Sequence, residues 1–136
     1  MTTSKLTPRQ RKDKTGFRSS REEQFFNAWV AFNPFGDDGI PKHDYSFTDE
    51  RGWLLDFAWP SVKVAVEVHG FGGGHQSIVG LARDAEKHRA CILGGWILIP
   101  MTSSCLGSKA KVEDMCHMVA DTIMNREQGL FGPQLS

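Results

Sequence analysis

Two acidic side chains, Asp56 and Glu67, interrupt apolar stretches of the chain and are the residues best suited to chemistry. Asp56 follows two leucines, and Glu67 stands within the valine-rich run Val62–Val68. The short connector 59–61 between the two runs favours a hairpin that brings both acids together. Hard divalent cations such as Mg²⁺ prefer oxygen ligands and keep several waters. The pair therefore indicates a magnesium site, although either acid alone is typical of a solvent-facing strand position.

Strands are the first elements that must position these acids. The valines at 62, 64, 66 and 68 alternate with other residues, which is the period of a β-strand. Residues 33–50 contain prolines, glycines and the turn signal Asp37-Asp38-Gly39, which predict a loop with a short extended stretch around Tyr45–Phe47. We expect three strands, at Trp53–Ala58, Val62–Val68 and Trp96–Pro100.

Helices are expected on either side of these strands. Ser20 and Glu23 have the spacing of a capping box, and the glycine pair after Leu93 is typical of a helix end. The predicted helices are Ser20–Phe32, Ser77–Leu93 and Ser108–Asn125. Together the elements predict an α/β fold in which a small mixed sheet is flanked by helices.

The 136-residue chain has the length of one domain. We expect a basic flexible arm (1–20), a single domain (21–128) and a loose C-terminal tail (129–136). Net charge is zero, but residues 1–21 carry seven basic residues against Asp13. Such an arm suits DNA phosphates, because their neutralisation releases counterions; a solvated terminus without a partner is the alternative. The basic residues are Lys5, Arg9, Arg11, Lys12, Lys14, Arg18 and Arg21.

The remaining composition excludes several classes of protein. The three cysteines lack the spacing of a zinc site. No apolar run approaches the roughly 20 residues of a membrane span, and no signal peptide is recognisable. We therefore expect a cytoplasmic protein without membrane association.

Taken in order, the acidic motifs resemble the PD-(D/E)XK nuclease superfamily, in particular very-short-patch repair endonucleases and Holliday junction resolvases. The resemblance covers residues 22–102 and implies a restriction-endonuclease-like core of helix, three strands, helix and strand. It implies Mg²⁺, for which Mn²⁺ substitutes, held by Asp56, Glu67 and the carbonyl of Val68. It also implies that a glutamate from the first helix reaches the metal site. The segments that carry it are Arg21-Glu22-Glu23-Gln24-Phe25, Leu55-Asp56-Phe57-Ala58-Trp59-Pro60, Val64-Ala65-Val66-Glu67-Val68 and Arg83–Ala90 followed by Gly94–Ile99.

Two positions leave the resemblance incomplete. The helical glutamate is Glu22 or Glu23, and we prefer Glu23 because the core residue Phe25 and its neighbour Phe26 follow it. The family's lysine, two positions after the second acid, is His69 here. Lys87 is the first candidate to replace it, and His69 and His75 are the second. Lys87 could instead be an exposed lysine paired with Asp84 on the same helical face.

By resemblance, the expected activity is hydrolysis of DNA phosphodiester bonds. The glycine-rich loop with His75 would lie near the DNA backbone. A compact nuclease of this type suggests a homodimer that cuts branched or junction DNA in recombination or repair, in a bacterial or phage setting. The alternatives are a mismatch or nicking repair endonuclease, a non-catalytic DNA-binding module that kept the fold, and a structural homodimer.

Overall fold

The computed structural model describes residues 17, 19–69 and 78–129, and these form one four-stranded sheet with three α-helices. The strand order is β1-β2-β3-β4, and both β1–β2 and β2–β3 pairs are antiparallel. β4 returns parallel to β3. The predicted mixed sheet with flanking helices is confirmed. The strands are β1 (Lys42–Ser46), β2 (Leu54–Trp59), β3 (Val64–Val68) and β4 (Ile97–Met101).

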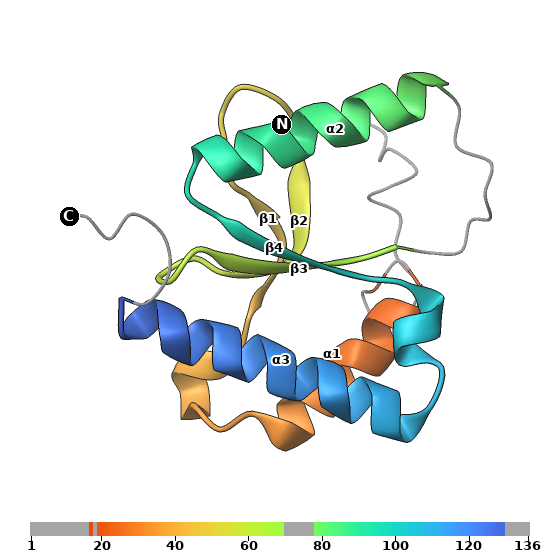
Figure 1. Cartoon of the computed structure of the whole chain (residues 1–136), viewed down its shortest axis with the longest axis vertical. Helices are drawn as coiled ribbons and strands as arrows, with labels where there is room; N and C mark the ends of the chain where they lie inside the picture. Colours follow the sequence, from red (N-terminus) through yellow and green to blue (C-terminus); the bar gives the residue numbers. More distant parts are fainter. Residues whose placement is uncertain (1–16, 18, 70–77, 130–136) are drawn as a thin grey trace, which may run out of the picture.

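Helices cover both faces of the sheet (Figure 1). α1 (Ser20–Phe32) and α3 (Lys109–Glu127) lie together on one face, and α2 (Ile78–Leu93) crosses the other. Two short 3-10 helices, η2 (Gly36–Gly39) and η3 (Ser103–Leu106), follow α1 and β4. α2 connects β3, the strand that carries Glu67, to the parallel strand β4.

The hydrophobic core is divided between the two faces. On the α1 and α3 face, Phe25 and Trp29 pack with Phe57 and with α3. On the α2 face, a smaller cluster includes Leu55 and Cys91. β2 and β3 are thus buried on both sides, which explains their nearly continuous apolar sequences. An acidic residue inside either strand therefore has apolar surroundings, in which a carboxylate is unusual.

The N-cap of α1 differs from the prediction by one residue, although the helix begins at Ser20 as expected. The N-cap is Ser19, whose Oγ accepts a hydrogen bond from the Glu22 backbone N–H at 3.2 Å. Ser20 is already helical, so the capping box expected at Ser20 and Glu23 was wrong. The residue three positions after the cap is Glu22.

The turn between β2 and β3 is longer than expected. Val62 N–H donates to the Trp59 carbonyl and Lys63 N–H to the Pro60 carbonyl, so both belong to the turn. Lys63 has a φ of 56°, which ends the extended run, and β3 begins at Val64 instead of Val62. None of the described helices is long and apolar enough to cross a membrane.

Candidate active site

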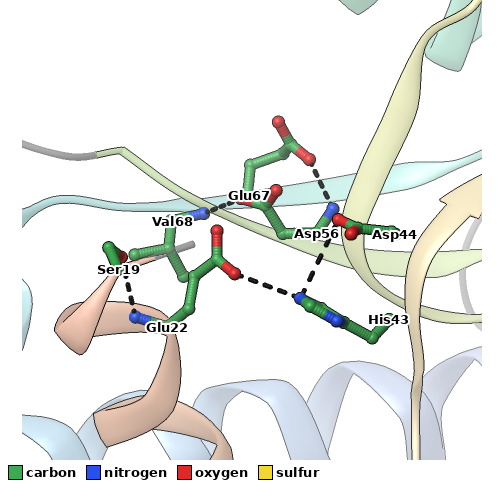
Figure 2. Close-up of polar contacts among 7 residues, drawn as sticks. All are labelled: Ser19, Glu22, His43, Asp44, Asp56, Glu67 and Val68. Atoms are coloured by element: carbon green, nitrogen blue, oxygen red, sulfur yellow. Dashed lines mark hydrogen bonds and ion pairs between the residues drawn. The ribbon is translucent and has the colours of Figure 1, made fainter. Parts of the chain in front are cut away.

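Asp56 and Glu67 lie just beyond the point where the β2–β3 ladder stops. The paired residues run from Trp59 with Val64 to Phe57 with Val66. At the next position the Asp56 N–H donates to Glu67 Oε2 at 2.8 Å, and the Val68 N–H donates to Asp56 Oδ2 at 2.8 Å (Figure 2). Each carboxylate thus accepts a backbone N–H from the neighbouring strand.

These two hydrogen bonds fix both acids in a buried place. Asp56 is 1% exposed and Glu67 is 7% exposed. A buried carboxylate costs free energy unless donors or cations compensate for its lost hydration. The structure brings together the two acids that the sequence singled out, and it holds them by their main chains as well as their side chains.

Lys87 supplies a positive charge from α2. Its Nζ lies 2.8 Å from Glu67 Oε1, and the Lys87 side chain is only 14% exposed. Lys87 therefore lies at the acid pair and is not the exposed helix lysine of the alternative interpretation. Asp84, the partner in that interpretation, is exposed.

Glu22, and not Glu23, is the buried glutamate of α1. Glu22 is 3% exposed, and its Oε1 lies 3.1 Å from His43 Nε2 on β1 (Figure 2). It shares the buried side of α1 with Phe25 and Trp29, which follow it at helical spacing. Glu23 is only partly buried. The role assigned to Glu23 stays a prediction, but the structure buries Glu22 more deeply, and the spacing to Phe25 and Trp29 was the signal that could have identified Glu22.

His43 and Asp44 were missed by the sequence analysis, which assigned most of residues 33–50 to a loop. His43 Nε2 also lies 3.8 Å from Asp44 Oδ1. Asp44 has a φ of 54°, in a left-handed region that few residues other than glycine, asparagine and aspartate adopt. No periodicity in the sequence marks this pair of residues.

The other predicted site residues have different surroundings. His69 is exposed, and its N–H donates to the Met101 carbonyl at 2.7 Å, beyond the end of the β3–β4 pairing. Arg21, expected to bind DNA, donates to Gln24 Oε1 at 2.9 Å and lies 3.5 Å from the Leu106 carbonyl, so it ties α1 to η3. The remaining predicted DNA contacts lie outside the described residues: Lys5, Arg9, Arg11, Lys12, Lys14, Arg18 and His75.

The acid pair fits a hard cation by its chemistry. Within residues 17, 19–69 and 78–129, no group of three or more His, Cys, Asp and Glu side chains is arranged to hold a metal ion. Magnesium needs fewer, since it is commonly bound through one or two carboxylates and keeps several waters. Asp56 and Glu67 provide two carboxylates. The Val68 N–H is hydrogen-bonded to Asp56, which fixes the backbone beside the pair. The Lys87 ammonium on Glu67 shows that the site favours positive charge.

Cys91 lies in the same region but is a structural thiol. Burial raises its pKa to about 11, with Lys87 lowering and Glu67 raising that pKa to a lesser degree. A thiol with this pKa stays protonated near neutral pH and is a poor nucleophile. Among the residues of this region, the two carboxylates and Lys87 are therefore the candidates for chemistry.

In comparisons with known proteins, the chain matches no family model, no curated protein and no solved structure. The function is therefore argued from the geometry of the site.

Proposed function

We propose that this protein is a metal-dependent DNA endonuclease of the restriction-endonuclease-like type. The observation that supports this best is the buried, mutually hydrogen-bonded pair Asp56 and Glu67 with Lys87 on its α2 side. The order α1, β1, β2, β3, α2, β4 supports the same fold type. Buried acids that accept backbone donors across a broken ladder are costly for a purely structural element, and a bound cation explains them.

The cofactor in this proposal is Mg²⁺, with Mn²⁺ as a substitute. Held by Asp56, Glu67 and the Val68 carbonyl, the ion would supply Lewis acidity toward water and the scissile phosphate. The residues of the chain do the positioning. The two backbone hydrogen bonds keep both carboxylates in place before any ligand arrives, and such preorganisation is a major source of catalytic power.

Lys87 takes the role that the family lysine has in the resembling nucleases. An ammonium has three N–H donors, and one of those on Lys87 is directed at Glu67 Oε1. The others can orient the attacking water or stabilise negative charge on the phosphate. His69, at the position of that lysine in the sequence, is exposed and is the second candidate.

The proposed substrate is branched DNA, as in a Holliday junction resolvase. Symmetric cuts across a four-way junction need two active sites, so the proposed assembly is a homodimer. The basic residues of 1–21 would contact phosphates and make binding sensitive to salt. The proposed setting is DNA recombination or repair in the cytoplasm of a bacterial host, with the gene carried by the bacterium or by a phage.

A substrate panel tests this function. Purified full-length protein is incubated with a four-way junction, a flap, a mismatched duplex and a plain duplex, with Mg²⁺, Mn²⁺ or a chelator. We expect metal-dependent, paired cuts in the junction and little cleavage of plain duplex. Preferred cutting of the mismatched duplex indicates a mismatch repair endonuclease instead. A lack of product on every substrate in both metals contradicts the proposal.

The replacement of the family lysine by His69 favours one other candidate, a non-catalytic DNA-binding module. It predicts salt-sensitive DNA binding that does not respond to metal, with no product. The same panel, read by gel shift as well as by cleavage, separates the two functions.

A further inference from the structure

Glu22 is held by a histidine whose orientation is itself fixed by aromatic rings. The His43 ring stacks on Phe57 with centroids 5.2 Å apart and an interplanar angle of 29°. It also packs edge to face against Phe17, with the ring centroids 4.9 Å apart. Phe57 is also the residue opposite His43 in the β1–β2 register. Strand pairing and ring packing together leave Nε2 directed at Glu22 Oε1, 3.1 Å away.

Hydrogen bonding sets the direction of this contact. With Glu22 ionised, its carboxylate can only accept, so the proton is on His43 Nε2 and that nitrogen donates. Figure 2 shows one Glu22 oxygen turned to His43 and the other turned toward the Val68 side of the site. His43 therefore selects which way the Glu22 carboxylate faces.

The backbone after His43 is irregular next to the acid pair. Asp44 lies between two register pairs, His43 with Phe57 and Tyr45 with Leu55, and so stands beside Asp56 on the neighbouring strand. Its φ of 54° is rare inside a strand. Irregular backbone of this kind is retained when the surroundings over-determine it, and it often accompanies a functional site. The irregularity coincides with the site on β1.

We infer that His43 is a positioning residue, which fixes the Glu22 carboxylate beside the acid pair, where its negative charge adds to the affinity of Asp56 and Glu67 for a cation. The inference rests on the proposed function and extends it to β1. A partner that orients a ligand commonly changes metal affinity when it is removed. The role of His43 is exerted through Glu22 and not through contact with DNA.

Binding of Mn²⁺ to the full-length protein, read from the electron paramagnetic resonance signal of free Mn²⁺, tests this role. His43→Phe keeps a ring between Phe17 and Phe57 but removes the nitrogen, whereas His43→Gln offers an amide nitrogen near the position of Nε2. We expect His43→Phe to weaken Mn²⁺ binding about tenfold and His43→Gln to recover to within about threefold of wild type. Thermal unfolding of each variant is recorded in parallel.

A second background shows whether His43 acts through Glu22. In Glu22→Ala protein, His43→Phe should change Mn²⁺ affinity by less than about twofold, because the group it orients is gone. Unchanged binding by His43→Phe, no recovery in His43→Gln, or the same loss in both backgrounds overturns the inference. If His43→Phe does not fold, His43→Asn replaces it in both comparisons, since its amide is too short to reach Glu22.

Asp56→Asn separates this inference from the proposed function. If wild-type protein binds Mn²⁺ no better than Asp56→Asn, the proposed metal site fails and the role of His43 fails with it. If Asp56→Asn abolishes binding while His43→Phe binds like wild type, only the inference about His43 fails.

Discussion

Lys87 Nζ on α2 lies 2.8 Å from Glu67 Oε1 on β3, although the two residues are 20 positions apart in the chain. The helix that follows Glu67 in the chain thus places the Lys87 ammonium against the Glu67 carboxylate. This contact gives the site a lysine without the sequence spacing at which the resembling nucleases carry theirs.

Replacing Lys87 by methionine keeps the apolar stem and removes the ammonium. We expect cleavage to fall by about a hundredfold or more, the effect of losing a group that stabilises charge in a transition state. Initial rates of junction cleavage measure this loss. His69→Ala should retain most activity, since its side chain is exposed. The reverse result, an active Lys87→Met with an inactive His69→Ala, would assign the role to His69.

Neighbouring glutamates on α1 provide a matched pair. Glu22 is 3% exposed and contacts His43, whereas Glu23 is only partly buried. We expect Glu22→Gln to lower cleavage by about tenfold or more, by analogy with other partners of metal sites, and Glu23→Gln to cleave like wild type. Cleavage as a function of Mg²⁺ concentration measures both. Equal losses in the two variants would contradict this assignment.

Two tryptophans donate to a single carbonyl and tie η2 to the core. Trp29 Nε1 and Trp59 Nε1 lie 2.7 and 2.8 Å from the Gly39 carbonyl. Trp29→Phe loses one of these hydrogen bonds and leaves space in the core, so we expect the free energy of unfolding to fall by about 2 kcal/mol. Urea denaturation measures the change, with the partly exposed Trp53→Phe as control. A loss below about 0.5 kcal/mol, the scatter of surface substitutions, would contradict this role.

The cysteines should differ in reactivity. Hydrogen bonds from Thr102 lower the pKa of Cys105, whereas burial raises the pKa of Cys91 and Cys116 to about 11. Because the thiolate is the reactive form, iodoacetamide at pH 8 should modify Cys105 first. Mass spectrometry of the alkylated protein identifies the site. Faster labelling of Cys91 or Cys116 in folded protein would contradict the burial of these thiols.

The same pKa values give a pH dependence of stability with a definite sign. Folding raises the pKa of the Cys91 and Cys116 thiols from 9.0 to about 11. Their contribution to the free energy of unfolding is therefore complete below pH 9 and is lost as the pH rises toward about 11. Urea denaturation of Cys91→Ala/Cys116→Ala protein should show a smaller loss over this range than wild type. An equal loss would assign the effect to other groups.

Much of the fold was predictable because its signals are local. The apolar alternation around Glu67 and the glycines after Leu93 identified β3 and the end of α2. β1 was harder, because Lys42–Ser46 carries charged and polar residues and only its middle positions are partly buried. The predicted N-cap of α1 was one residue too late because Ser19 and Ser20 are both suitable caps, and only packing distinguishes them.

The site could be predicted only where the order of the elements and the apolar pattern of the sequence indicate it. Asp56 and Glu67 stand out because they interrupt apolar strands, and α2 had to pass above β3 for Lys87 to reach Glu67. The contact of Glu22 with His43 depends on how α1 packs against β1, and no spacing in the sequence encodes that packing. The ring packing that orients His43 is a tertiary feature of the same kind.

Cleavage of a four-way junction by Asp56→Asn tests the central claim most directly. The amide oxygen of asparagine can still accept the Val68 N–H, so the variant keeps the hydrogen bond but loses the charge that a metal requires. Asp121→Asn, at an exposed position on α3, is the matched control. We predict cleavage by wild type and Asp121→Asn in Mg²⁺ and no detectable product from folded Asp56→Asn. Undiminished cleavage by Asp56→Asn would contradict the assignment of Asp56 to the metal site.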